Sequence, residues 1–182
     1  MERLIVFMIL SVPIIIISWR TLFHVKSHGF YRFLAWEGIL WLLVSNITFW
    51  FTHPLGWNQL ISWTLLIIAG VFVITGVVTM KRKGRPSKTR SDQTLYAFEK
   101  TTRLVDTGIF HYIRHPLYSS LLFLCWGAFF KQMNFELFIV SVATSIFLYF
   151  TALSDEKECI KTFGNDYTEY KKRTKRFIPF II

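Results

Sequence analysis

The sequence predicts an all-α, polytopic integral membrane protein with about five transmembrane helices and a cytoplasmic helical segment at its C-terminal end. Three observations predict this fold. Hydrophobic residues make up 53% of the 182 residues. They gather in long uncharged runs rather than at a helical or strand period, which is typical of segments that contact lipid on several sides. Lys and Arg lie almost entirely between alternate runs, as they do in cytoplasmic loops.

Five apolar runs supply the predicted spans, with four spans as the alternative count. They cover residues 4–19, 33–51, 57–80, 117–130 and 135–153. Because a span needs about 20 residues, the first and fourth runs are short, and we expect residues 1–3 and 113–116 to lengthen them at the interface. Trp19 and Arg20 follow the first run without a small-residue cleavage pattern, so this run is interpreted as an uncleaved anchor.

The positive charges orient these spans. Three Lys and Arg lie between the first two runs, nine in residues 81–114 and seven in residues 157–176, and the remaining two are Arg3 and Lys131. An odd number of spans places the nineteen on one side, so the positive-inside rule predicts an N-terminus outside and all long polar segments in the cytoplasm.

One domain, residues 1–182, is expected. It divides into three N-terminal spans (1–80), a cytoplasmic connector (81–116), and the last two spans with the C-terminal segment (117–182). The connector begins with the basic stretch KRKGRPSKTR, which suits a linker near anionic headgroups. Gly164 is the predicted end of the last long helix, and Asn165 begins a further helix through Lys175.

The formal charge of +10 does not indicate nucleic acid binding, because charge runs without a groove-reading motif are equally expected of cytoplasmic loops. Membrane lipids are the expected partners, and the sequence leaves the oligomeric state open. Cys125 and Cys159 lie in unlike surroundings, apolar and charged, so two free thiols are predicted.

The stretch GIFHYIRHPLYSS, residues 108–120, joins a charged and aromatic cluster to an apolar helix. Proline favours the first helical turn and keeps the residue before it out of the helix, so the helix is predicted to begin near Pro116. Free amides at residues 117–119 and the neighbouring Arg114 would suit a ligand carboxylate. An ordinary span entry with interfacial Arg114, His115 and Tyr118 is the alternative.

Asp155, Glu156 and Glu158 lie where the fifth run leaves the apolar layer. Carboxylates against apolar surface need partners. The simpler interpretation pairs them with Lys157, Lys161 or Arg114; the other has Glu156 hold a ligand ammonium group.

In order along the chain, these features resemble a family of integral membrane methyltransferases, typified by isoprenylcysteine carboxyl methyltransferase and phospholipid methyltransferases. The resemblance covers the C-terminal half of the chain. The matching positions are Gly108, Phe110, Arg114, His115, Pro116, Tyr118, Asp155, Glu156, Phe163, Gly164, Tyr167, Tyr170, Arg176 and Pro179. Asp155 departs from the family pattern, which has the first of two glutamates at this position.

The resemblance implies methyl transfer from S-adenosyl-L-methionine to a lipophilic acceptor at the cytoplasmic membrane face. The acceptor could be an isoprenylcysteine carboxylate, a phospholipid amine or a small thiol. The implied cofactor-binding residues are His115, Tyr118, Glu156, Phe163 and Tyr167. Arg114, His115 and Arg176 are the predicted catalytic residues, and His115 could also accept a proton from an amine or thiol. Arg173 is a further candidate for orienting the acceptor.

Glu37 lies within the second run, where a carboxylate costs about 2.5–3.5 kcal/mol at a bilayer centre and usually has a partner or a function. It is predicted either to contact substrate or to pair with Arg32 or His28. His24 and His28 have i, i+4 spacing but no third ligand in the run, so no metal is predicted.

Two other functions are compatible with the sequence. Membrane sterol reductases share a related C-terminal helical arrangement and bind NADPH in the corresponding place, although they have more spans than 182 residues allow. A non-catalytic lipid-binding membrane protein is the other alternative.

Overall fold

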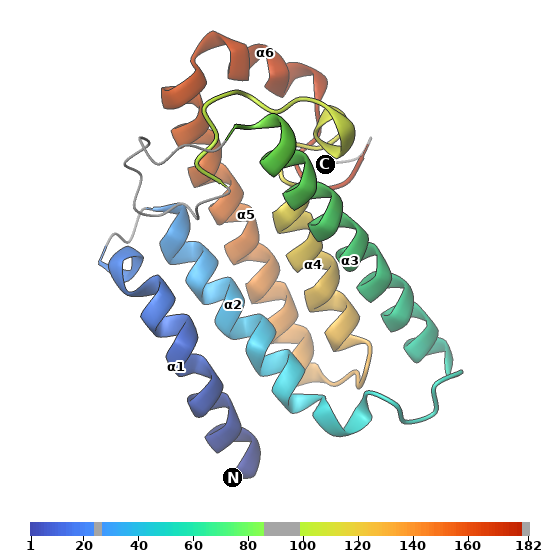
Figure 1. The fold of residues 1–182 in the computed structure, drawn as a ribbon. Coiled ribbons are helices and arrows are strands. Elements are labelled where there is room, and N and C mark those ends of the chain that lie inside the picture. The colour runs from blue at the N-terminus through green and yellow to red at the C-terminus, as the bar shows by residue number, and fades with distance from the viewer. Residues whose placement is uncertain (24–26, 86–98, 180–182) are drawn as a thin grey trace.

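The computed structural model describes residues 1–23, 27–85 and 99–179. Figure 1 shows the helices α1 to α5 side by side and the shorter α6 across one end of them. The helices are α1 (Glu2–Leu22), α2 (His28–Ser45), α3 (Trp57–Lys83), α4 (Pro116–Phe129), α5 (Phe135–Phe163) and α6 (Asn165–Arg173), with 3₁₀ turns η1 (Ile47–Phe49) and η2 (Gly108–His111). Within the described ranges the only β-type pairing is one bridge between Ile113 and Lys175. The all-α prediction is confirmed.

Among the described residues, α1, α3 and α5 are long and apolar enough to cross a membrane, and α4 is a shorter apolar helix. The chain therefore has the helices of a polytopic membrane protein, while the number of spans stays a prediction. Each of the five predicted runs overlaps one of the α-helices α1 to α5.

The fourth predicted span is not lengthened by residues 113–115, and this expectation is wrong. These residues lie outside α4 because their backbone pairs with the C-terminal segment, where the Arg114 amide donates to the Lys175 carbonyl over 2.8 Å. The 14 residues of α4 rise about 21 Å. Packing on α2, α3 and α5 compensates, since backbone at membrane depth is tolerated where protein covers it.

The second predicted run is shifted along the chain in the structure. The α2 helix begins at His28, earlier than the apolar run, because the Ser27 side chain accepts a hydrogen bond from the Phe30 amide (3.3 Å) and caps the helix. It ends at Ser45, and residues 47–49 form η1 instead of continuing the helix. The Asn46 side-chain amide donates to the Ala128 carbonyl (2.9 Å) and fixes this end against α4.

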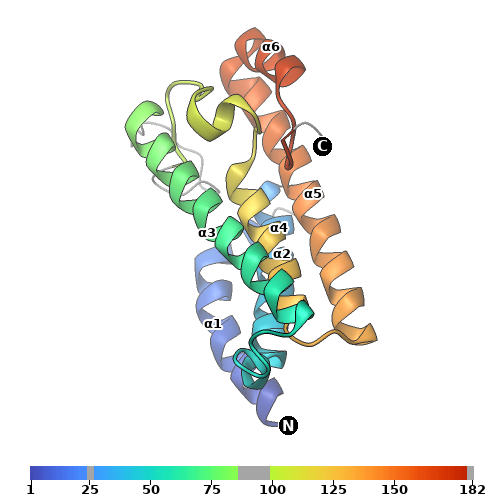
Figure 2. The same cartoon turned by 90° about the vertical axis from the view of Figure 1, so that its right-hand side faces the viewer.

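The helices pack in pairs, α3 on α4, α2 on α5 and α1 on α2; Figure 2 shows α3 and α5 on either side of α4. The apolar core lies between α2, α4 and α5 and consists of Ile39, Leu42, Cys125, Ala128, Phe129 and Leu137. The α2 and α5 helices approach closely at Gly38, where an added Cβ would lie 2.1 Å from the Thr144 Oγ1.

Lys131 lies in the connection between α4 and α5 and is buried, with 2% of its surface exposed. Its ammonium donates to the Gln59 Oε1 (2.9 Å) and lies 3.4 Å from the ring centroid of Trp63. Burial lowers the pKa of Lys131. This end of the helices is therefore closed by a network of contacts.

At the opposite end α5 runs on to Phe163, and the backbone reverses at Gly164, whose φ of 58° suits glycine. The α6 helix then begins at Asn165, as predicted, and ends at Arg173 rather than Lys175. Tyr170 fixes α6 to the bundle, because its hydroxyl donates to the Phe110 carbonyl over 2.6 Å.

Candidate active site

The chain before α4 pairs with the chain after α6. Ile113 and Lys175 form a parallel bridge, and the His115 amide donates to the Arg176 carbonyl over 3.2 Å. Two motifs that are far apart in the sequence, the Arg-His-Pro lead-in and the closing Arg-x-x-Pro, are thereby held side by side. No local pattern in the sequence predicts this pairing.

Pro116 occupies the first turn of α4, as predicted, and His115 before it has a non-helical backbone (φ −124°, ψ 61°). The prediction that the amides of residues 117–119 are free is wrong at Ser119, whose amide donates to the His115 carbonyl (2.9 Å). The Ser119 hydroxyl also donates to the Phe177 carbonyl (2.7 Å) and anchors the C-terminal segment on α4.

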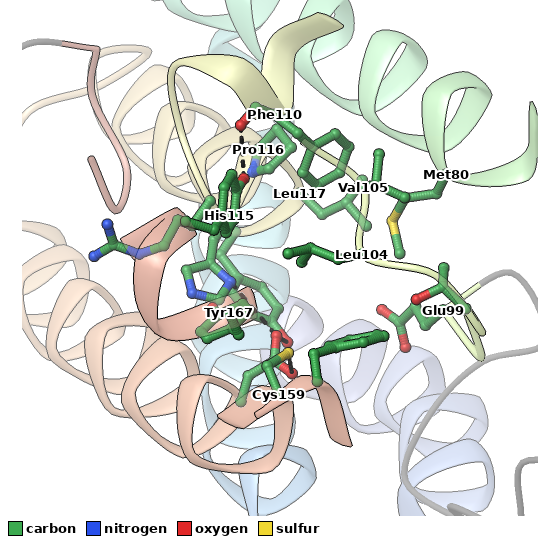
Figure 3. A pocket seen from close by; sticks show the side chains of 16 residues that line it. Met80, Glu99, Leu104, Val105, Phe110, His115, Pro116, Leu117, Cys159 and Tyr167 are labelled. Atoms are coloured by element: carbon green, nitrogen blue, oxygen red, sulfur yellow. Dashed lines mark hydrogen bonds and ion pairs between the residues drawn. The ribbon is translucent and has the colours of Figure 1, made fainter. Parts of the chain in front are cut away.

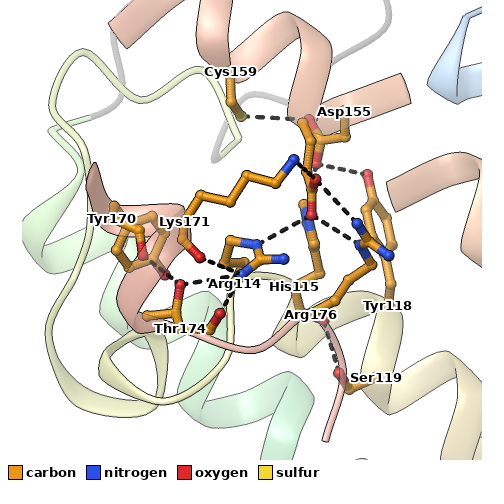
Figure 4. A network of polar contacts seen from close by, with 11 residues as sticks. Arg114, His115, Tyr118, Ser119, Asp155, Cys159, Tyr170, Lys171, Thr174 and Arg176 are labelled. Atoms are coloured by element: carbon orange, nitrogen blue, oxygen red, sulfur yellow. Dashed lines mark hydrogen bonds and ion pairs between the residues drawn. The ribbon is translucent and has the colours of Figure 1, made fainter. Parts of the chain in front are cut away.

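The buried Glu156 is the centre of an ionic cluster, and Figure 4 labels its three cationic partners, Arg114, Lys171 and Arg176. Its side chain is 2% exposed and lies 2.8 Å from the Lys171 Nζ, 2.9 Å from the Arg176 Nε and 3.1 Å from the Arg114 Nε. We call these four residues the Glu156 cluster. Hydrogen bonding to Glu156 raises the pKa of Arg176. A buried carboxylate of this kind is stable only with such partners, so the interpretation that pairs the acid with Arg114 is confirmed for Glu156.

Two of the three guanidinium nitrogens of Arg114 bind within the protein. Its Nη1 donates to the Lys171 carbonyl (3.1 Å) and to the Thr174 carbonyl, while its Nε contacts Glu156. From the sequence, this guanidinium was predicted to bind a ligand carboxylate. In the structure its N–H groups instead hold the end of α6 and the segment after it in place.

His115 lies between two carboxylates. Its Nδ1 is 3.4 Å from Asp155 and its Nε2 is 3.5 Å from Glu156. The Tyr118 ring stacks on the imidazole with centroids 5.3 Å apart, and its hydroxyl donates to Asp155 over 3.2 Å. Burial opposes protonation, but the hydrogen bonds and charges of Asp155 and Glu156 outweigh it, so the pKa of His115 is raised above its usual 6.5.

A pocket opens beside His115, between α3, α4, α5, α6 and the segment that precedes α4 (Figure 3). We call it the aromatic pocket. Four of the five predicted cofactor-binding residues line it: His115, Tyr118, Phe163 and Tyr167. Glu156 does not, and the carboxylate that reaches the pocket from this part of α5 is that of Asp155.

Several residues that line the aromatic pocket were not predicted from the sequence. They include Met80, Glu99, Leu104, Val105 and Cys159. Glu99 is positioned by Arg32 of α2, whose Nη1 lies 3.2 Å from its Oε2. No motif or period marks Glu99 in the sequence, whereas Asp155 was already prominent as the departure from the family pattern.

The remaining predicted residues lie outside the aromatic pocket. Arg173 is exposed and contacts Asp106 over 2.5 Å. Arg176 belongs to the Glu156 cluster. Glu37 accepts a hydrogen bond from the Ser11 hydroxyl of α1 (2.6 Å), whereas its predicted partner Arg32 contacts Glu99.

Three potential metal ligands do come together, although no metal was predicted. Ligand atoms of His28, Asp155 and Glu158 lie within 4.8 Å of one another. The His28 Nδ1 is 2.8 Å from Glu158, and Asp155 contacts His115, so hydrogen bonding within the protein accounts for their proximity. His24, the other residue of the i, i+4 pair, lies outside the described residues.

The fold and site define a class of protein: an all-helical membrane-type chain with a polar, aromatic-lined pocket at one end of its helices. The sequence model of the family described as phospholipid methyltransferase matches residues 57–166, more than half of the chain. The chain therefore belongs to this family.

The proteins that are similar to this chain are named for different activities. The chain is 24% identical to a methanethiol S-methyltransferase of Crocosphaera subtropica (76% of this chain, 58% of the relative). It is 27% identical to the human protein-S-isoprenylcysteine O-methyltransferase (69% and 45%) and 26% identical to the Delta(14)-sterol reductase TM7SF2 of Mus musculus (81% and 37%). The alignments thus cover roughly half the length of these relatives or less. No solved structure matches the chain.

Proposed function

We propose that this chain is a membrane methyltransferase that transfers a methyl group from S-adenosylmethionine to a lipophilic acceptor at the cytoplasmic membrane face. The observation that supports this most directly is the aromatic pocket. It lies at the end of the helices that carries most of the positive charge, next to the motif residues His115 and Tyr118. Two methyltransferases among the relatives support the same reaction class.

The pocket has the chemistry that this donor requires. Its aromatic lining (Phe110, Tyr118, Phe163, Tyr167 and Tyr170) suits a sulfonium and an adenine ring. The carboxylates of Asp155 and Glu99 can receive an ammonium group. The buried Tyr167 hydroxyl has no hydrogen-bond partner among the described residues, which leaves a polar group for a ligand to satisfy.

When bound, S-adenosylmethionine supplies an electrophilic methyl group on a positively charged sulfur. The chain's own residues align the reactants and exclude water, which is the main requirement of an in-line displacement. Asp155 and Tyr118 fix the imidazole of His115 beside the pocket. Glu156 acts behind the pocket wall by holding Arg114 and Arg176, and so keeps α4 and the C-terminal segment together.

The raised pKa of His115 bears on its role. The raised pKa favours the protonated imidazole, which faces the carboxylates of Asp155 and Glu156. An acceptor that is already nucleophilic, such as a carboxylate or a thiolate, would need no proton transfer to His115. The names of the two methyltransferase relatives mention methanethiol and isoprenylcysteine. These names are compatible with a thiolate acceptor and with a carboxylate acceptor.

Calorimetric titration of the purified protein with S-adenosylmethionine and with NADPH tests the proposal. We expect binding of S-adenosylmethionine, and a strong loss of affinity in Glu156→Gln. The matched control is Glu136→Gln, since Glu136 lies on the same helix, at its other end, and is exposed. Binding of NADPH alone would favour the reductase function, and binding of neither would favour a non-catalytic lipid-binding protein.

The acceptor can be identified separately. Membrane extracts incubated with the protein and a methyl-labelled donor should yield labelled lipophilic products by mass spectrometry. Label only in water-soluble molecules would contradict the lipophilic class. Reporter fusions at the N-terminus and at the C-terminus test the proposed orientation, with the C-terminal reporter expected in the cytoplasm.

A further inference from the structure

A second hollow lies beside the Glu156 cluster, formed by the end of α6, the segment after it and Arg114. Apart from Thr174 it is lined only by cationic residues: Arg114, Lys171, Lys172, Arg173, Lys175 and Arg176. We call it the cationic hollow. It shares Arg114 with the aromatic pocket and no other lining residue. The proposed methyl transfer does not require the exposed members of this set.

The charges around the hollow do not balance. Arg114, Lys171 and Arg176 all contact Glu156, so a single carboxylate serves three cations. Lys175 has no carboxylate partner among the described residues. Mutual repulsion of closely spaced cations raises the free energy of the folded chain, and a bound anion would relieve it.

The other two cations have acidic partners at the surface. Lys172 contacts Glu169 over 2.7 Å and Arg173 contacts Asp106 over 2.5 Å. All four side chains are at least 40% exposed, so water screens these pairs and an anion can compete for the cations. Six cations face three carboxylates, which leaves three positive charges in excess.

The hollow lies close to the level at which α5 leaves the apolar layer. The Arg176 guanidinium is 5.0 Å from the ring centroid of Tyr149, an exposed residue of α5 within the last apolar run. Phe177 and Ile178 then pack on Tyr118 and Ala152. This places the cations at the depth of lipid headgroups, if α5 crosses the membrane as its length and composition allow.

We propose that the cationic hollow binds the phosphate group of an anionic phospholipid in the adjoining leaflet, as a site separate from the aromatic pocket. Phosphate oxygens accept hydrogen bonds from ammonium groups and from the planar guanidinium fork. Basic clusters beside membrane helices attract anionic lipid. A soluble phosphate would meet the same cations, but the depth of Arg176 beside Tyr149 favours a lipid.

Native mass spectrometry of the full chain, released from membranes of mixed phosphatidylglycerol and phosphatidylcholine, tests this proposal. The test variant is Lys172→Gln/Lys175→Gln, which removes two exposed charges of the hollow. The matched control is Lys81→Gln/Lys83→Gln, which removes two exposed charges from the last turn of α3. We expect the wild type and the control to retain phosphatidylglycerol, and the test variant to retain it roughly tenfold more weakly.

Three results would overturn the proposal. Equal loss in both variants would mean diffuse attraction to a basic surface. Equal retention of both lipids by the wild type would mean no anion site. Complete displacement of the lipid by millimolar inorganic phosphate would mean a site for soluble phosphate. Donor titrations of the same variants, expected to match the wild type, keep this outcome distinct from that of the methyltransferase proposal.

Discussion

A charged side chain is buried at each end of the helical bundle, Lys131 at one end and Glu156 at the other, and the surroundings of the two are opposite in kind. Lys131, at the end where α4 meets α5, has no acidic partner among the described residues; a side-chain amide, a carbonyl and two indole rings surround it. Glu156, at the other end, contacts three cations and lies near a histidine. The first end is closed, whereas the second has an excess of charge and a pocket.

This difference distinguishes buried polar groups that stabilise the fold from buried polar groups that belong to a functional site. The groups around Lys131 satisfy one another, and the atoms at that end that have no hydrogen-bond partner among the described residues, the Asn46 Oδ1 and the Ser45 Oγ, line no pocket beside it. Around Glu156 the cations outnumber the acids, and the Tyr167 hydroxyl has no partner among the described residues. Perturbed, incompletely satisfied groups beside a pocket are the usual mark of a functional site. The following substitutions test whether the two ends are independent.

Glu156→Gln should have the largest effect. It leaves the Arg114 and Arg176 guanidinium groups without their shared carboxylate, and breaking a buried ion pair costs about 3–5 kcal/mol. We expect a large fall in the melting temperature in detergent together with a loss of S-adenosylmethionine affinity of at least about 100-fold. Calorimetry and thermal unfolding measure both. Wild-type affinity in this variant would refute the assigned role of Glu156.

Lys131→Met should have the second largest effect. It should lower the stability of the fold without changing the affinity for the methyl donor. The variant removes the donor to the Gln59 Oε1, and leaving a buried acceptor unsatisfied costs about 1–3 kcal/mol. Donor affinity should stay as in the wild type, because the aromatic pocket lies at the other end of α4. A parallel fall in affinity would show that the two ends are coupled.

The same contrast explains what could be predicted from the sequence. The apolar runs and proline placed the helices and the start of α4, because hydrophobic length and backbone restriction are local properties. The order of motif residues identified four pocket residues, His115, Tyr118, Phe163 and Tyr167. Local properties were therefore sufficient for the helices, whereas the four pocket residues followed from the resemblance to a family.

Features that depend on distant contacts were not predictable. The pairing of Ile113 with Lys175 joins the segment before α4 to the segment after α6, and no local pattern signals it. Glu99 reaches the pocket through its contact with Arg32 of α2. Glu156 was expected to face a ligand, but Lys171 and Arg176, which follow it on α6 and beyond, enclose it. Only the tertiary fold brings these charges together.

The pH dependence of stability tests the charged state of His115. Because its folded pKa is raised, protonated His115 stabilises the fold fully below its unfolded pKa of about 6.5, and this contribution is lost as the pH rises through the folded pKa. The difference in melting temperature between the wild type and His115→Gln should therefore shrink as the pH rises above about 6.5. A difference that grows with pH would show that the imidazole is neutral in the fold.

Tyr118→Phe should have the smallest effect, because it removes one hydrogen bond and retains the ring that stacks on His115. Its hydroxyl donates to Asp155 over 3.2 Å, and a typical buried hydrogen bond contributes about 0.5–1.5 kcal/mol. Ser62→Ala removes a comparable bond, 2.6 Å long, to the Gly127 carbonyl near the Lys131 end. Both variants should lower the melting temperature slightly, but only Tyr118→Phe should weaken donor binding, since Asp155 then loses one of the contacts that aim it at the pocket. If Ser62→Ala weakened donor binding equally, the pocket would depend on the stability of the whole bundle rather than on the contacts of Asp155.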